Sequence, residues 1–223
     1  MLSAIIAGAL LSVIVISLWK TLNHRAIRDH QRRLETAIIA LYNYNDVVRH
    51  MPPRVIRTQT GKALGSWRMA LVPYLPSPSF VDLGVPWNAR ANRYLASSPM
   101  YPFCFTEKPY TNIVAVAGPD TAFDHREATA ISDFPNDLIV LVEYKARRIS
   151  WAGPGDVRLA DIDSAITRGY HGNGINVAFV DHVVWYLDNT VPSNLLRRFC
   201  TVAGARKLNR DVELSAYVRF SMP

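Results

Sequence analysis

Residues 2–53 read LSAIIAGALLSVIVISLWKTLNHRAIRDHQRRLETAIIALYNYNDVVRHMPP, and the main structural signals of the chain lie in this segment. Its first part, from Leu2 to Trp19, holds no charged residue and only three serines as polar side chains. A hydrocarbon core about 30 Å thick takes roughly 20 helical residues to cross, so residues 1–19 are predicted to form a transmembrane span. Trp19 and Lys20 stand where an interfacial aromatic and a cation are expected. A cleavable signal peptide and a buried soluble helix are the alternatives.

The second part, residues 20–51, has the pattern of an amphipathic helix. One face consists of positions three or four residues apart: Ile27, Gln31, Leu34, Ile38, Leu41 and Asn45. Gln31 fills the turn between Ile27 and Leu34. Charged side chains lie off this stripe: Arg28, Arg32, Arg33 and Glu35. No Gly or Pro interrupts the chain between Ala9 and Met51, and Pro52-Pro53 ends the helix. We predict one continuous helix of about 45 residues, whose second half buries its stripe against a globular part.

The positive charge of the chain is concentrated after the predicted span. The formal net charge is +7 at pH 7, and eight basic but only three acidic side chains lie between Lys20 and Thr58. Basic residues beside a span are attracted to anionic lipid head groups. We therefore expect the lipid bilayer to be contacted by residues 1–19 and by a basic juxtamembrane collar: Lys20, Arg25, Arg28, Arg32 and Arg33. A solvated helix face would explain the same charges, and nucleic acid is not an expected partner because no basic stripe interleaved with aromatics follows.

The composition excludes several classes of protein. The 223 residues are 49% hydrophobic and 19% charged, which is enough apolar surface for a core and excludes a disordered chain. The apolar residues after the first 19 are scattered, which excludes a polytopic membrane protein. Two cysteines exclude a disulfide-rich scaffold. Cys104 and Cys200 either pair or remain separate buried thiols.

Residues 52–223 are predicted to form an α+β globular head. Short runs rich in β-branched residues predict strands at Ile113–Ala117, Leu138–Glu143, Ile175–Val180, Val183–Leu187 and Val212–Phe220. Helices are expected over Asn88–Ala96, with Asn88 as the cap, and over Ser193–Ala203. Strands joined by turns rather than by regular βαβ alternation favour antiparallel pairing. The predicted fold is therefore α+β, with a long N-terminal helix, its first half transmembrane, packed on an antiparallel sheet.

Short signatures in a fixed order carry a family resemblance. They are Tyr42–Asp46, Met51–Pro53, Ser66–Arg68, Pro73–Leu75, Pro86–Asn88, Asn92, Cys104, Thr111–Asn112, Ala117–Pro119, Thr121–Phe123, Glu143, Trp151–Asp156, His171–Gly174, Asn176 and Phe179–Asp181. From about Leu34 to Leu187 the chain resembles the bacterial domain of unknown function 1559 family, whose members have prepilin-like N-termini. The resemblance implies a pilin-like fold, similar to type IV pilins and type II secretion pseudopilins, in which half of a long N-terminal helix lies in the membrane.

The chain differs from the pattern of that family in two places. Prepilins carry a basic leader, a Gly-Phe cleavage site and a glutamate five residues into the mature chain, whereas here Gly8 precedes Ala9 and Val13 stands at the glutamate position. We therefore expect a divergent member that lacks the prepilin cleavage motif. In the predicted hairpin, Asp181-His182 replaces the Asp-Gly of the family, and histidine adopts the positive φ of a primed turn less readily than glycine. We predict a longer or distorted turn there.

No cluster along the sequence has the spacing of an established catalytic or metal site. The residue types suited to such chemistry gather at Asp124-His125, His171 and Asp181-His182. They are not accompanied by a G-x-S-x-G elbow, an H-E-x-x-H motif or a C-x-x-C pair. Neighbouring Asp and His side chains on a strand would also point to opposite faces. We predict no catalytic, cofactor-binding or metal-binding residue and no cofactor.

The sequence thus predicts a non-enzymatic, single-pass membrane protein whose pilin-like head acts in cell-envelope interactions or assembly. Its expected partners besides the lipid bilayer are other envelope proteins or pilin-like subunits. Its expected location is the bacterial inner membrane, with the head on the outer, periplasmic side. One alternative is a membrane-tethered binding or sensory module that does not polymerise. Another is an anchored hydrolase that uses His171 or His182.

Overall fold

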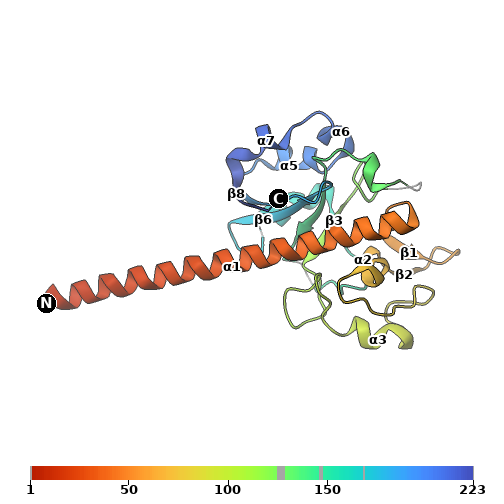
Figure 1. Ribbon diagram of the computed structural model, residues 1–223, viewed down its shortest axis with the longest axis horizontal. Coiled ribbons are helices and arrows are strands. Elements are labelled where there is room, and N and C mark those ends of the chain that lie inside the picture. The colour runs from red at the N-terminus through yellow and green to blue at the C-terminus, as the bar shows by residue number, and fades with distance from the viewer. Residues whose placement is uncertain (1, 125–128, 146–147, 168, 223) are drawn as a thin grey trace.

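The computed structural model describes residues 2–124, 129–145, 148–167 and 169–222, without the side chains of residues 2–11, 13, 20, 167, 221 and 222. Its fold is α+β, as predicted: a long N-terminal helix packs against a six-stranded sheet (Figure 1). In the described part of the chain, no helix combines the length and the apolar character needed to cross a membrane. Most of the predicted span, residues 1–19, lies outside the described side chains.

Helix α1 runs without a break from Leu2 to Val48, which confirms the predicted continuous helix. It ends where Arg49 adopts a left-handed conformation, with φ of 69°, just before Pro52-Pro53. All six positions of the predicted stripe are buried: Ile27, Gln31, Leu34, Ile38, Leu41 and Asn45. The C-terminal half of α1 lies across the head, and the N-terminal half extends away from it (Figure 1).

The six strands lie in the order β5-β3-β4-β6-β7-β8. Their bounds are β3 Ile113–Ala117, β4 Ile139–Glu143, β5 Val157–Arg158, β6 Gly174–Phe179, β7 Val184–Asp188 and β8 Val218–Met222. All neighbours pair antiparallel except β3 and β5, which are parallel, with Val116 opposite Val157. The sheet is therefore mixed, and the prediction of a purely antiparallel sheet was wrong.

The parallel edge follows from a buried ion pair. Asp156, directly before β5, accepts hydrogen bonds from the backbone N–H of Ala115 on β3, at 3.0 Å, and from Arg68, at 2.7 Å. Neither Arg68 nor Asp156 has an exposed side chain. Since this carboxylate fixes the chain beside the middle of β3, the two residues that follow it extend along β3 in the same direction.

Both faces of the sheet are covered, which explains why its central strands are apolar throughout. One face packs against α1 and α2 (Trp67–Leu71), and the core there includes Leu34, Ile38, Ala115 and Val140. The other face packs against α4 (Ile162–Thr167) and α5 (Ser193–Phe199). The remaining elements are a two-stranded sheet of β1 (Val55–Arg57) and β2 (Ala63–Ser66), and the short helices α3 (Arg90–Ala96), α6 (Val202–Ala205) and α7 (Arg210–Glu213).

Three predicted elements differ from the structure, two of them because of a local hydrogen bond. The helix predicted over Ser193–Ala203 divides into α5 and α6 because the Thr201 hydroxyl caps α6 by accepting from the N–H of Gly204. Most of Val212–Phe220 is not strand: Asn209 caps α7 there, and β8 begins only at Val218. Helix α3 begins at Arg90 with Ala89, rather than Asn88, in the capping position.

The hairpin turn between β6 and β7 is longer than two residues, as predicted. The N–H of His182 donates to the carbonyl of Phe179 at 3.2 Å, and the N–H of Phe179 donates to the carbonyl of Val183 at 3.0 Å. The loop therefore has three residues, Val180, Asp181 and His182, and His182 takes the left-handed position with φ of 72°. This is the three-residue hairpin geometry that ends in a left-handed residue.

The two cysteines are separate. Cys104 is buried on the face of the sheet that α1 covers, and Cys200 is buried on the opposite face. Of the two alternatives, the structure contains the free thiols and not the disulfide.

Candidate functional site

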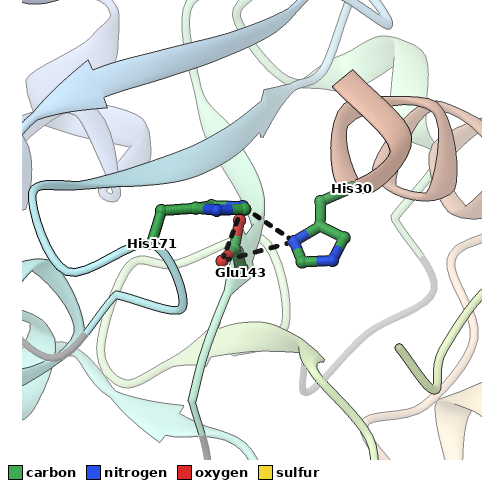
Figure 2. Close-up of side chains that lie close together, drawn as sticks. All are labelled: His30, Glu143 and His171. Atoms are coloured by element: carbon green, nitrogen blue, oxygen red, sulfur yellow. Dashed lines mark hydrogen bonds and ion pairs between the residues drawn. The ribbon is translucent and has the colours of Figure 1, made fainter. Parts of the chain in front are cut away.

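A cluster of three side chains lies between α1 and the sheet: His30, Glu143 and His171 (Figure 2). His171 Nε2 lies 2.9 Å from His30 Nδ1. The Oε1 atom of Glu143 lies 3.7 Å from His30 Nδ1 and 3.8 Å from His171 Nε2. One atom of each residue thus faces the other two, and Figure 2 shows these atoms turned toward a common centre.

Each member is placed by a different segment. His30 lies on α1 one turn after Ile27 and one turn before Leu34, so the helical period that buries the apolar stripe buries this imidazole too. Glu143 is the last residue of β4, after four buried apolar residues. His171 lies in the loop before β6, next to Gly172, which has a left-handed φ of 79°.

The carboxylate of Glu143 is held by the head but has no arginine or lysine partner among the described residues. Its Oε1 accepts the backbone N–H of Tyr170 at 3.2 Å, and its Oε2 accepts the side-chain amide of Asn176 at 2.5 Å. The Glu143 side chain is 0% exposed. Because burial of an unpaired charge is costly, these two hydrogen bonds stabilise the carboxylate, and the imidazoles of His30 and His171 are the described groups placed to add a positive charge beside it.

Aromatic rings surround the cluster and exclude water from it. Phe105 stacks on His30 with ring centroids 3.8 Å apart, and the edge of Tyr170 meets His30 at 4.8 Å. Tyr186 lies against His171 at 5.9 Å and donates its hydroxyl to the Asn173 side chain.

This environment changes the pKa of two groups in the cluster. Burial lowers the pKa of His171, and nearby His30 lowers it further, whereas Glu143 acts in the opposite direction. Burial, with Glu143 and Asp188 nearby, raises the pKa of the Tyr186 phenol. The lowered pKa of His171 favours its neutral imidazole, whose Nε2 shares a hydrogen bond with His30 Nδ1, and the raised pKa of Tyr186 keeps its phenol protonated.

Two imidazoles and a carboxylate are donors suited to a divalent first-row transition metal ion. The same three groups could otherwise share protons, since the two rings are within hydrogen-bonding distance. Access for a substrate is poor: the side chains of His30, Glu143 and His171 are all nearly or completely buried. The arrangement suits a structural site better than a catalytic one.

The sequence singled out only one member of this cluster. Asp124 is exposed and accepts the backbone N–H of Asp120, while His125 lies outside the described residues. Asp181 forms an ion pair with Arg210 at the hairpin turn. His182 packs on the ring of Tyr42 in the same turn, away from His171.

His30 and Glu143 were missed as candidate ligands, although each left a signal in the sequence. His30 lies directly before Gln31 of the predicted stripe, three residues after Ile27 and four before Leu34, a spacing at which a helix buries apolar residues. Glu143 is an acidic residue directly after a run of buried apolar residues.

The arginines of the predicted basic collar lie in two different environments. Arg25, Arg28 and Arg32 are exposed on α1. Arg33 is half-buried, pairs with Asp29 at 2.9 Å and donates to the carbonyl of Cys104 at 2.7 Å. Arg33 thus helps to hold α1 on the head.

Comparisons with protein-family models, with curated proteins and with solved structures found no match for this chain. Any function of the chain has to be inferred from its own residues and their geometry.

Proposed function

We propose that the chain is a non-enzymatic, single-pass membrane protein whose pilin- or pseudopilin-like head makes contacts in the bacterial cell envelope. The observation that carries the proposal is the division of α1 into a half packed on the head and a half that extends from it (Figure 1). Among the described side chains of α1, the first buried one is Ile27. The segment before it therefore needs a partner outside the head.

The exposed apolar side chains of that segment support a lipid environment. Ile14, Val15, Ile16, Leu18 and Trp19 are each between 53% and 64% exposed. Successive residues of a helix are about 100° apart, so these five positions spread over an arc of about 200° around the axis. Such an arc is wider than the single apolar stripe with which a helix docks on one protein surface, and a broadly apolar helix suits lipid.

The exposed arginines after the apolar segment support a membrane surface at this part of α1. Arg25, Arg28 and Arg32 follow the apolar segment within about three turns of helix. Their side chains would reach the anionic head groups at the surface where α1 leaves the bilayer. The pilin resemblance favours a periplasmic head, with the inner membrane as the location.

A tether that does not polymerise is the second candidate. Val13 stands where prepilins have the glutamate that pairs with the next subunit during assembly. Crosslinking in intact membranes separates the two: a ladder of multimers supports assembly, and a single monomer band supports the tether. An anchored hydrolase is the weakest candidate, because His171 is buried with His30 and His182 lies in a turn against Tyr42.

Membrane fractionation of the full chain tests the anchor. We expect the wild type to remain in the membrane pellet after an alkaline carbonate wash and to be extracted by detergent. The double variant Ile16→Asp/Leu18→Asp introduces two charges, each costing up to roughly 2.5–3.5 kcal/mol at the centre of a span and less toward its end, and should move the chain toward the soluble fraction. The control Val212→Asp, at a position 73% exposed on the head, should stay in the pellet.

Recovery of the wild type in the soluble fraction without detergent would refute the anchor. Protease treatment of spheroplasts tests the side of the membrane, because a periplasmic head is digested while the membrane is intact and a cytoplasmic head is protected.

A further inference from the structure

We propose that His30, Glu143 and His171 bind one divalent first-row transition metal ion, zinc in the first instance, and that this ion fastens α1 to the sheet. The proposal goes beyond the envelope role and does not depend on it. It revises our expectation, based on sequence spacing, that the chain holds no metal-binding residue.

The distances between the three donor atoms fit a metal of this size. They are 2.9, 3.7 and 3.8 Å along the sides of the triangle. The point equidistant from three such atoms lies about 2.0 Å from each, which is the length of a zinc–nitrogen or zinc–oxygen bond. No movement of the backbone is needed to bring the three donors within bonding distance of one ion.

The chemistry of the donors selects the class of ion. Two imidazole nitrogens and one carboxylate oxygen suit zinc and its first-row neighbours, whereas calcium and magnesium prefer oxygen donors alone. On binding, the ion takes the place of the hydrogen bond between His30 Nδ1 and His171 Nε2. The proton of that bond moves through solvent to the other nitrogen of its own ring, so both neutral rings carry their hydrogen away from the ion. The negative charge of Glu143 is compensated by the ion.

The surroundings of the cluster are those of a prepared cation site. Asn176 and the backbone N–H of Tyr170 orient the carboxylate, as hydrogen-bonding neighbours of metal ligands commonly do. The Oδ1 atom of Asn176 is buried and accepts no hydrogen bond from the described residues. Asn176 thus leaves one buried acceptor unpaired beside the carboxylate that it orients.

The position of the cluster determines what the ion would do. Its ligands come from α1, from the end of β4 and from the loop before β6, three segments far apart in the sequence (Figure 2). An ion at their centre links the long helix to the middle of the sheet. Because all three side chains are nearly or completely buried, the role is structural.

Zinc binding by the untagged full-length protein in detergent micelles tests the proposal. The protein is stripped with a chelator, dialysed against zinc chloride and analysed for metal content. We expect one zinc per chain in the wild type. The variants His30→Asn, Glu143→Gln and His171→Asn should each bind zinc at least roughly 100-fold more weakly, since even removal of a residue that orients a ligand costs 10–100-fold.

His24→Asn is the matched control. His24 lies on the same helix, is exposed, and packs against the ring of Phe220 outside the cluster, so the variant should bind zinc as the wild type does. X-ray absorption of the zinc-loaded wild type provides a readout that does not depend on the folding of a variant. It should show two imidazole ligands with oxygen as the remaining donor.

Three results would overturn the proposal. One is a stripped wild type that takes up no zinc above a buffer blank. Another is a set of cluster variants that fold and bind zinc with wild-type affinity. The third is an absorption spectrum with fewer than two imidazole ligands.

Discussion

The isoleucine pair at positions 38 and 39 gives the sharpest test of how α1 is held by the head. The two residues are adjacent and chemically identical, yet Ile38 is 0% exposed and Ile39 is 43% exposed. Ile38 packs in the core that contains Trp67 and Trp151, beneath the face of the sheet that α1 covers. The pair therefore differs in tertiary packing and not in helix propensity or in the residue removed.

We expect Ile38→Ala to lower the free energy of unfolding by about 2–5 kcal/mol, because it removes buried methyl groups and leaves a cavity in a close-packed core. Ile39→Ala should cost about 1 kcal/mol or less, since part of the side chain is already in water and alanine is the better helix former. For a chain of this size, a loss of about 3 kcal/mol corresponds to a fall of roughly 6–12 °C in Tm.

Urea unfolding of the full chain in detergent, followed by tryptophan fluorescence, measures both variants. The buried rings of Trp67 and Trp151 lie in the same core as Ile38, so their emission reports its loss directly. A far-ultraviolet circular dichroism transition at the same urea concentration would establish that the head unfolds in one step. If Ile38→Ala were no more damaging than Ile39→Ala, the claim that α1 is an integral part of the core would be wrong.

Three further predictions concern the interior of the head. Asp156→Asn should lower the free energy of unfolding by about 3–5 kcal/mol because it leaves the buried guanidinium of Arg68 without its carboxylate, whereas the surface variant Asp161→Asn should leave the urea midpoint unchanged. Burial raises the pKa of Cys104 to about 11 and raises that of Cys200 as well, so iodoacetamide at mildly alkaline pH should label neither thiol in the native protein and both in urea; rapid labelling of the native protein would contradict the burial. Zinc at 100 times its Kd should stabilise the chain by about 2.7 kcal/mol and raise Tm by roughly 5–11 °C, reversibly with a chelator, and an unchanged Tm would contradict the metal link.

The long helix and its buried stripe could be predicted because their signals are local. Helical periodicity and the absence of Gly or Pro are properties of consecutive residues, and they correctly identified the buried face from Ile27 to Asn45. The longer hairpin turn was also predicted from a local signal, because Asp181-His182 offers no glycine for the positive φ of a two-residue turn. In the structure the loop has three residues, and His182 takes the positive φ. The parallel edge of the sheet was not predictable in this way. It depends on Asp156 reaching a backbone N–H on β3 and the side chain of Arg68, contacts that only the folded chain creates.

The candidate site was missed for the same reason. Metal and catalytic motifs are recognised by ligands at fixed short spacings. Such motifs point only to residues close together in the sequence, such as the pair Asp181-His182. The cluster instead combines residues from a helix, a strand and a loop, with His30 and His171 in contact across 141 positions of sequence. Only the topology of the sheet, which places the end of β4 beside the start of β6, could reveal it.

The polar residues on the buried face of α1 fix the position of the helix along its axis. An apolar stripe alone specifies which face of a helix is buried but only weakly specifies its axial position, because a shift of one turn, about 5.4 Å, presents a similar apolar surface. On α1, the side chain of Gln31 donates to the carbonyl of Phe220, and the side chain of Asn45 accepts the N–H of Ile131. His30, the residue before Gln31, meets His171 and Glu143.

A shift of one turn would break all three contacts together. It would bring an apolar residue of α1, Ile27 or Leu34, toward the buried carboxylate of Glu143 in place of an imidazole. A buried charge that loses its partner costs several kcal/mol, and the orphaned groups at Phe220 and Ile131 add to that cost. The polar contacts therefore resist movement of the head along α1. A metal ion at the His30 contact would strengthen this resistance, because sliding would then require the loss of His30 as a ligand.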